Sequence, residues 1–371
     1  MEKVKLGDVV NLNMGQSPES TSYNDEGNGL PFFQGNADFG KVNPIPRVWC
    51  TKPRKIAHKN DILLSVRAPI GAINIANYEC CIGRGLCALT TSSKIDKNYL
   101  YYFLISQNKN LNSRGTGSTF KAINKDILLE LEIPLPSLEE QKAIAGKLDK
   151  VSGLIEKRKT QLEKLDLLIK SRFIEMFGNP VSNDKDWQHQ AMDKVAPSSA
   201  GLGDNSETVW LLNLDMVEAQ TGRILDYLYV EKAQVGTSTC AFDEGNVLYS
   251  KLRPYLNKVV VPTKKGYCTT ELVPLRPNEK LNRQFLAYLL RSEAFVSFIN
   301  EKVAGAKMPR VSMNVFREFE CILPPIDLQN EFAAFVKQTD KSKFQIQKSL
   351  EKLEILKKSL MQQYFGWKNE L

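Results

Sequence analysis

Basic side chains gather in two stretches of the chain, and they are the residues whose types and spacing most readily suggest chemistry. They lie beside Trp49 and His58 in the first half, and among glycines, prolines and amides in both halves. Loops of this composition can place lysine or arginine against phosphates, and arginine, asparagine or glutamine against base edges. The residues are Arg47, Lys52, Arg54, Lys55, Lys59, Arg67, Arg84, Arg114, Lys121, Lys251, Arg253, Lys258, Lys264, Lys265, Lys307 and Arg310. For any single one, the alternative is a charge that only solvates the surface.

Six of these residues are our predicted nucleic-acid contacts. The net charge supports the prediction only weakly, because 50 Lys and Arg against 42 Asp and Glu leave +8. Proteins without a polyanionic partner also show such a bias. The six predicted contacts are Arg54, Arg67 and Lys121 in the first half, and Lys251, Arg253 and Arg310 in the second.

Patterns that would indicate catalysis or metal binding are missing. The [DNS]-P-P-[FYW] tetrapeptide of DNA methyltransferases does not occur, and LPPI at residues 323–326 has the wrong residue at both ends. The G-x-G at residues 115–117 follows a polar stretch rather than a strand, which favours a flexible loop over a cofactor site. G-x-x-x-x-G-K-[ST], G-x-S-x-G and H-E-x-x-H are absent too. With only His58 and His189, far apart in sequence, we expect no catalytic residue and no metal site.

The composition is that of an ordinary globular protein. The 371 residues are 42% apolar and 25% charged, with a mean hydropathy of −0.30, and at roughly 150 residues per domain they suggest about two domains. Neither a run of about 18 apolar residues nor a signal-peptide pattern is present. The seven cysteines include no C-x-x-C, so neither a disulfide framework nor a zinc ribbon is indicated. We expect a cytoplasmic protein that does not bind membranes.

The chain repeats itself at an offset of 188 residues. Residues 117–178 align without a gap on residues 305–366, and sixteen of the 62 aligned positions are identical. The best block is QLEKLDLLIKS against SLEKLEILKKS, and both copies end in Phe-Gly. Upstream, KNDILLS at residues 59–65 resembles EGNVLYS at residues 244–250. A repeat of this length indicates a duplication in which the framework was kept and the surface between diverged.

Each copy has the same predicted layout. A mixed segment with short strands, turns and one helix leads into a strand that contains prolines, and a long helical stretch follows. Prolines suit the start of a helix, and Gly178 and Gly366 suit its end. The predicted fold class is mixed α/β, with two similar globular domains separated by two long helices. The boundaries are 1–137 for the first domain, 138–178 for its helix, 179–325 for the second domain and 326–371 for its helix.

The two long helices carry apolar residues at heptad spacing. Heptads sustained over about four repeats favour pairing of the helices as an antiparallel coiled coil. The alternative is two unrelated amphipathic helices, each lying on its own domain. At 1.5 Å per residue, about 39 residues would make a rod of roughly 58 Å. The predicted seam consists of Leu148, Ile155, Leu162, Leu165, Ile169, Ile346, Leu350, Leu353 and Leu360.

Taken in order, these motifs give the chain a family resemblance. It resembles the specificity subunit of Type I restriction–modification systems over essentially its whole length. The motifs are IPLPSLEEQKAI (133–144), QLEKLDLLIKSRF (161–173), SLEKLEILKKSL (349–360), GDVV near residue 7, DILLSVRAPIG (61–71) and VLYSKLRPYLNKV (247–259). The second copy departs from the pattern, since Asp327-Leu328 replaces Glu139-Glu140 ahead of the shared glutamine.

The resemblance implies a non-catalytic DNA-binding subunit. In this family each target recognition domain reads one half of a bipartite sequence in double-stranded DNA, and the coiled coil sets the unread spacer. Two modification subunits bring S-adenosylmethionine and methylate adenine, while restriction subunits use ATP and Mg²⁺. No cofactor is expected in this chain. The sequence does not indicate which bases are read, because base preference depends on the diverged segments, and these match no pattern of known base preference.

Two other functions stay open at this point. One is a cytosolic coiled-coil scaffold whose two domains bind proteins, with no DNA readout. The other is a stand-alone nuclease or methyltransferase with an unrecognised site. Sequence-specific duplex binding that weakens steeply with salt separates DNA reading from the scaffold, because counterions are released when phosphates are neutralised.

Overall fold

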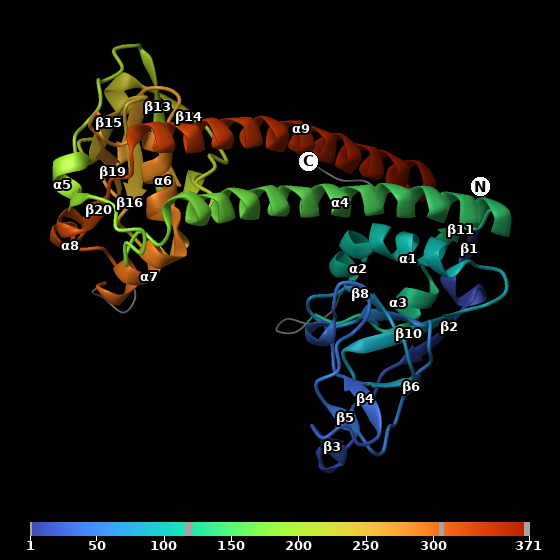
Figure 1. The fold of residues 1–371 in the computed structure, drawn as a ribbon. Coiled ribbons are helices and arrows are strands. Elements are labelled where there is room, and N and C mark those ends of the chain that lie inside the picture. The colour runs from blue at the N-terminus through green and yellow to red at the C-terminus, as the bar shows by residue number, and fades with distance from the viewer. Residues whose placement is uncertain (1, 116–120, 304–307, 367–371) are drawn as a thin grey trace. The chain divides into compact units, whose positions relative to one another are not determined.

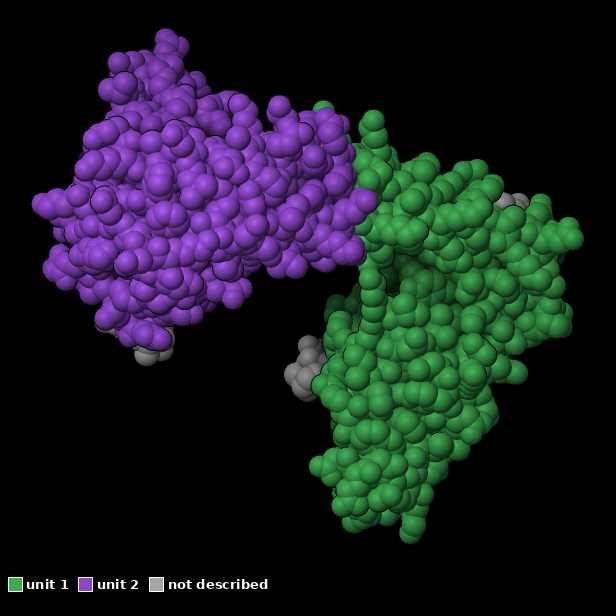
Figure 2. Space-filling view, in the orientation of Figure 1, with its two compact units in different colours: residues 1–159, 348–371 green, residues 160–347 purple. Residues whose placement is uncertain are grey.

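The protein forms two compact units. A computed structural model describes residues 2–115, 121–303 and 308–366, so residues 116 and 117 of the expected glycine loop and the basic residue Lys307 lie outside the described residues. Unit 1 consists of residues 1–159 with 348–371, and unit 2 of residues 160–347 (Figure 2). Each unit holds one globular domain and half of each long helix. The two boundaries within the helices are 188 residues apart, the offset of the sequence repeat.

The described residues of the globular domain in unit 1 form three small sheets. Their strand orders are β2-β10-β7-β8, β3-β5-β4-β9-β6 and β1-β11. All neighbours are antiparallel except β4 and β9, which run parallel. The strands are β1 (Lys3–Lys5), β2 (Val10–Met14), β3 (Tyr23–Asn24), β4 (Leu30–Phe33), β5 (Trp49–Cys50), β6 (Ile56–Ala57), β7 (Ile62–Ser65), β8 (Ile73–Ile75), β9 (Cys80–Ile82), β10 (Leu86–Thr91) and β11 (Glu132–Pro134).

The main core of unit 1 is formed by the four-stranded sheet and helix α1. The Asp96 side chain begins α1 by accepting the free N–H groups of Asn98 and Tyr99, as an N-cap should. Tyr99 and Phe103 are then fully buried against residues of β7 and β10. The helices of this domain are α1 (Lys97–Ser106), α2 (Asn108–Arg114) and α3 (Lys125–Leu129).

Unit 2 repeats this topology with small changes. Its sheets have the orders β17-β16-β19, β14-β13-β18-β15 and β12-β20, and again one inner pair, β13 with β18, is parallel. The strands are β12 (His189–Ala191), β13 (Thr208–Leu212), β14 (Leu228–Glu231), β15 (Thr239–Phe242), β16 (Val247–Ser250), β17 (Val259–Val260), β18 (Gly266–Thr269), β19 (Leu272–Leu275) and β20 (Glu320–Ile322). The helices are α5 (Met192–Val195), α6 (Arg283–Arg291), α7 (Glu293–Glu301) and α8 (Met313–Glu318).

Two 40-residue helices, α4 (Leu138–Phe177) and α9 (Ile326–Phe365), complete the fold (Figure 1). A capping box begins α4, because Ser137 Oγ accepts the Glu140 N–H and the Glu140 carboxylate accepts the Ser137 N–H. Gly178 and Gly366 follow the two helices with φ of 73° and 65°, the left-handed conformation that glycine adopts most easily. Among the described residues, no helix is long and apolar enough to cross a membrane.

The two helices pair antiparallel within each unit. In unit 1, Leu148 of α4 shares a core with Met361 of α9, and Lys159 forms an ion pair with Glu354. In unit 2, Phe173 of α4 contacts Phe332 of α9, with ring centroids 5.5 Å apart. Residue numbers therefore rise along one helix as they fall along the other. The fold is the expected mixed α/β duplication with an antiparallel coiled coil.

The predicted seam residues differ in how deeply they are buried. Leu148, Ile155, Ile169 and Leu350 are buried, whereas the others are half-buried. Lys343 interrupts the apolar seam of α9 and forms an ion pair with Asp166 of α4. The half-buried seam residues are Leu162, Leu165, Ile346, Leu353 and Leu360.

A buried glutamine fixes the start of each long helix to its own domain. Gln141 Nε2 donates to the carbonyl oxygens of Lys94 and Pro136, and its Oε1 accepts the Asp96 N–H at 2.8 Å. Gln329 makes the same three bonds, to Lys280, Pro324 and Asn282. Since both glutamines are fully buried, these bonds satisfy groups that would otherwise be costly to leave unpaired.

The aromatic end of each helix should be essential for the stability of the unit in which it is buried. Phe365 packs on Tyr99 and Phe103 of unit 1, with ring centroids 5.1 and 6.1 Å apart. We expect Phe365→Ala to lower the free energy of unfolding of unit 1 by about 3 kcal/mol, measured by urea denaturation. Ile355→Ala on the same helix is the control, because Ile355 is 66% exposed and should change stability by about 0.5 kcal/mol or less. Equal effects of the two substitutions would contradict this packing.

Candidate nucleic-acid interface

Two of the three predicted contacts of unit 1 lie in one cluster of backbone segments. The Val66 N–H donates to the Gly85 carbonyl (2.9 Å), the Ile123 N–H donates to the Val66 carbonyl (3.0 Å), and the Ala68 N–H donates to the Lys121 carbonyl (3.2 Å). These bonds join the end of β7, the turn between β9 and β10, and the chain just before α3. We call residues 66–69, 85 and 121–123 the first loop cluster. Arg67 and Lys121 belong to it.

Unit 2 contains the same cluster in equivalent positions. The Lys251 N–H donates to the Glu271 carbonyl (3.0 Å), the Val311 N–H to the Lys251 carbonyl (2.9 Å), and the Arg253 N–H to the Pro309 carbonyl (2.8 Å). Residues 251–254, 271 and 309–311 are the second loop cluster. It contains all three predicted contacts of this half: Lys251, Arg253 and Arg310.

A buried serine at the end of a strand supports each cluster. The Ser65 hydroxyl, at the end of β7, donates to the carbonyl oxygens of Arg67 and Pro69, at 2.9 Å from each. The Ser250 hydroxyl, at the end of β16, donates to the Leu252 carbonyl at 2.9 Å. Neither serine was among the predicted site residues. The signal was present, because each is the final residue of the repeated segments KNDILLS and EGNVLYS.

Most of the clustered cations have no acidic partner among the described residues. Arg67, Lys121 and Arg253 are exposed, Lys251 is half-buried, and their side chains form no ion pair in the part of the chain that the structure describes. Arg310 differs, since its guanidinium pairs with the Glu271 carboxylate. Unpaired, exposed cations on anchored backbone are suited to bind phosphate or base edges.

Arg253 adopts a left-handed backbone conformation, with φ of 49°. Non-glycine residues adopt this region at a cost of roughly 1 kcal/mol. The bond to Pro309, and a second in which the Arg253 carbonyl accepts the Leu256 N–H at 2.9 Å, hold the residue in place. The second loop cluster therefore presents the Arg253 side chain from a fixed position.

Arg54 lies outside the first loop cluster. It follows β5 and precedes β6 in the five-stranded sheet, where its guanidinium forms an ion pair with Glu19 at 2.8 Å. Its guanidinium is thus already engaged by a carboxylate, unlike those of Arg67 and Arg253.

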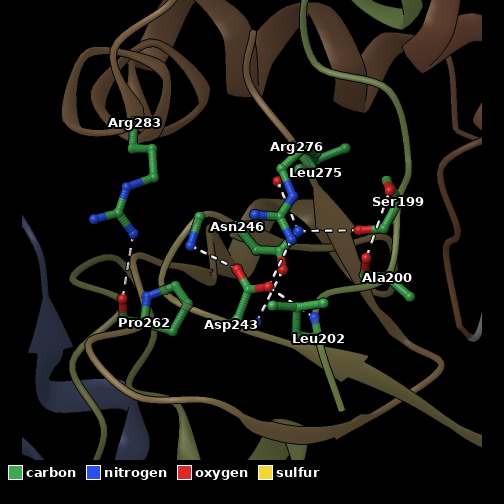
Figure 3. Close-up of polar contacts among 10 residues, drawn as sticks. Ser199, Ala200, Leu202, Asp243, Asn246, Pro262, Leu275, Arg276 and Arg283 are labelled. Atoms are coloured by element: carbon green, nitrogen blue, oxygen red, sulfur yellow. Dashed lines mark hydrogen bonds and ion pairs between the residues drawn. The ribbon is translucent and has the colours of Figure 1, made fainter.

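A buried polar network around Asp243 lies at the opposite end of the β16–β19 strand pair from the second loop cluster. Figure 3 shows that Asp243 accepts hydrogen bonds from the Leu202 N–H and the Arg276 guanidinium, both at 2.7 Å. Asn246 Nδ2 donates to the carbonyl oxygens of Ser199 and Leu275. The network fastens the strand-free segment around residues 199–202 to β19 and to the turn that leads into β16.

The Asp243 carboxylate is held in its ionised form. The hydrogen bond from Arg276 is the largest cause, and the N–H groups of Leu202 and Gly245 add to it, so that they lower the pKa of Asp243 to about 2 although burial opposes them. By contrast, burial raises the pKa of the Cys87 thiol to about 12, which keeps that thiol protonated. In residues 2–115, 121–303 and 308–366, no three His, Cys, Asp or Glu side chains lie close enough together to hold a metal ion.

Comparison with known protein families agrees with this doubled architecture. The family described as "Type I restriction modification DNA specificity domain" matches the chain twice, at residues 1–167 and 185–357. Because the two matches cover most of the sequence, the chain belongs to this family and carries one copy of the domain in each half.

Individual relatives carry the same description. The putative type I restriction enzyme MjaX specificity subunit of Methanocaldococcus jannaschii is 47% identical over 169 residues, which make up 44% of this chain and 40% of that protein. The type I restriction enzyme EcoDI specificity subunit of Escherichia coli is 24% identical over 404 aligned positions, covering 98% of this chain and 87% of that protein. The crystal structure of the Type-I restriction-modification system S subunit from M. genitalium covers 100% of this chain and 96% of that one, with a TM-score of 0.62 and 18% identity, which shows a shared fold.

The Asp243 network should make unit 2 sensitive to acid. Because the pKa of Asp243 is lowered on folding, its contribution is complete above the ordinary carboxyl pKa of about 4 and is lost as the pH falls towards about 2. We expect Asp243→Asn to lower the free energy of unfolding of unit 2 by about 2 kcal/mol at neutral pH, with the difference vanishing near pH 2. Urea denaturation across this pH range measures it, with Asp193→Asn as the control, since the ion pair of Asp193 among the described residues is with its neighbour Lys194 at 3.8 Å. A pH-independent loss would contradict the assignment.

Proposed function

We propose that this chain is the subunit that reads a bipartite sequence in double-stranded DNA, one half-site for each globular domain. The observation that carries the proposal is the pair of equivalent loop clusters. Their backbone bonds are the same in both domains, whereas the side chains they display differ. The same backbone framework with different polar side chains is the arrangement expected of two DNA-binding domains that prefer different bases.

The chain supplies recognition, and partner subunits supply the chemistry. Two modification subunits would bind it and methylate adenine with S-adenosylmethionine, and restriction subunits would add reactions that need ATP and Mg²⁺. The absence of catalytic motifs from the sequence and membership of the specificity-domain family support a non-catalytic role. Methyl transfer to DNA by the purified chain alone would contradict it.

The paired helices would act as the ruler between the half-sites. Both helices belong to both units, so the number of helical residues on either side of the unit boundary would contribute to the spacing of the readers. Their length, rather than the DNA sequence, would then fix how many base pairs separate the half-sites.

The six predicted contacts should fall into two kinds. Losing a lysine that contacts phosphate, as in Lys121→Ala or Lys251→Ala, should weaken binding to all duplexes and lower the slope of log K against log salt by about 1. Losing an arginine that reads a base, tested with Arg54→Ala, Arg67→Ala, Arg253→Ala and Arg310→Ala, should relax one position at a cost of about 1–3 kcal/mol. Titration of labelled duplexes at several salt concentrations measures both effects.

The matched control for these variants is Lys3→Ala. Lys3 also carries one positive charge on unit 1, but it pairs with Glu132 on β11, away from the loop clusters. It should leave affinity and salt slope nearly unchanged. If all six contact variants behave like Lys3→Ala, this interface is wrong, and a chain that binds no duplex specifically would favour the protein-binding scaffold.

An insertion in the helices should change the spacer and leave both half-sites intact. Four residues add roughly 6 Å and nearly preserve the helical face, which is close to two base pairs along a duplex with 3.4 Å per pair. We expect insertions of four residues after Lys159 in α4 and after Gln347 in α9 to lengthen the spacer by about one or two base pairs. The methylated motif, read genome-wide in a host that carries the complete system, measures this.

Inserting in both helices keeps each half of the antiparallel pair in register. The single insertion, within residues 157–161 of α4 alone, is the comparison, because it shifts the seam against α9 and should also cost stability. If the double-insertion variant still methylates DNA with an unchanged spacer, the helices do not set the distance between the readers.

A further inference from the structure

Two polar side chains, those of Ser17 and Gln34, meet the backbone N–H of Arg84 beside the first loop cluster. Gln34 follows β4, Arg84 lies in the turn between β9 and β10, and Ser17 is the third residue after β2. Gln34 Nε2 donates to Ser17 Oγ at 3.0 Å, and the Arg84 N–H donates to the same oxygen at 3.3 Å. We call Ser17, Gln34 and Arg84 the Arg84 cluster.

The backbone beneath this cluster is packed as closely as glycine permits. A Cβ at Gly15 would lie 2.2 Å from the Gly83 carbonyl oxygen, and one at Gly85 would lie 2.4 Å from that of Gln34. Backbone bonds tie the same segments, since the Gly83 N–H donates to Phe33 and the Gly85 N–H donates to Gln34. Three separate stretches of chain therefore form one rigid support.

The side chains on this support retain unused hydrogen-bonding groups. Arg84 is exposed, and its guanidinium forms no ion pair or hydrogen bond with any of the residues that the structure describes. The nearby Asp38 carboxylate is already occupied, as it accepts the Gln34 N–H at 2.9 Å and pairs with Arg47 at 2.8 Å. The Gln34 amide can donate and accept further bonds beyond its contact with one hydroxyl.

The Arg84 cluster is continuous with the first loop cluster. The Gly85 carbonyl next to Arg84 accepts the Val66 N–H at 2.9 Å, and Val66 immediately precedes Arg67. The first loop cluster and the Arg84 cluster are thus joined by backbone hydrogen bonds. This is the arrangement in which phosphate contacts set the register while neighbouring side chains reach base edges.

The second domain carries other residues at the matching positions. There the Glu271 carbonyl takes the place of the Gly85 carbonyl, by accepting the Lys251 N–H at 3.0 Å. The residue before it is Thr270, so threonine stands where unit 1 has Arg84. Asn213, directly after β13, corresponds to Gln34 after β4.

We infer that the Arg84 cluster determines which bases the first domain recognises. In this arrangement the Arg84 side chain hydrogen-bonds to a guanine and the Gln34 side chain hydrogen-bonds to an adenine. The inference rests on the proposed function and names its base-reading groups. A guanidinium matches the O6 and N7 acceptors of guanine, and a glutamine amide matches N6 and N7 of adenine in the major groove. Ser17 positions Gln34, and Thr270 gives the second domain a different preference at the equivalent place.

The test is selection of duplexes from a randomised library by the full-length chain. Wild type should select a bipartite motif with a guanine and an adenine in one half. Arg84→Ala should lower the preference for that guanine about tenfold or more, and Gln34→Ala should do the same for the adenine. Arg84→Gln should shift the guanine position towards adenine. The second half-site should be unchanged in every variant, and the remaining positions of the first half-site should be kept too, which shows that the first domain is folded.

The other outcomes contradict the inference in distinguishable ways. If Arg84→Ala weakens all sequences equally and lowers the salt slope by about 1, Arg84 contacts phosphate and the assignment is wrong. It is also wrong if wild type and both alanine variants select the same motif, or if the second half-site relaxes too. Lys3→Ala supplies the control for loss of one charge. If wild type itself selects no motif, the proposed function fails, and the inference fails with it.

Discussion

The fold depends on burying the aromatic end of each long helix. Phe177 ends α4 and packs against Phe285 of unit 2, with ring centroids 4.7 Å apart, while Phe365 ends α9 and packs against Tyr99 of unit 1. Each helix begins on its own domain, at Gln141 or Gln329, and ends in the core of the other unit. Each core therefore includes a helix end from the other copy of the repeat: residues 160–177 in unit 2 and residues 348–365 in unit 1. The antiparallel pairing of the helices follows from this exchange.

The fold was largely predictable, because the sequence contains two copies of the same pattern. A repeat at one offset, prolines before each long stretch and glycines after it predict two helices of about 39 residues, and the heptad spacing predicts their pairing. The depth of the seam could not be predicted. Leu162 and Leu165 are only half-buried, and Lys343 occupies a seam position because Asp166 provides an opposite charge across the pair. Such compensation depends on the partner helix and leaves no periodic signal in either helix alone.

The candidate site was predictable in part. Loop composition predicts Arg67 and Lys121 as contacts, and the backbone brings these two residues together although more than fifty residues separate them in the chain. The carboxylates that engage Arg54 and Arg310 could not be foreseen, since Glu19 and Glu271 are remote from them in sequence. The Arg84 cluster was missed as a unit for the same reason. Its three residues come from separate segments, and only the close backbone approach at Gly15 and Gly85 unites them.

The exchange of helix ends has a consequence for the origin of the protein. A chain of half the length, with one domain and one helix, would expose the aromatic end of its helix and leave its own core open. Two such chains could complete each other's cores by exchanging the ends of their helices. They would form a symmetric dimer in which every contact occurs twice. Fusion of two copies would preserve all those contacts and remove the need for the halves to stay identical. The two domains would then be free to acquire different loops while the helices and the buried contacts at their ends stayed the same.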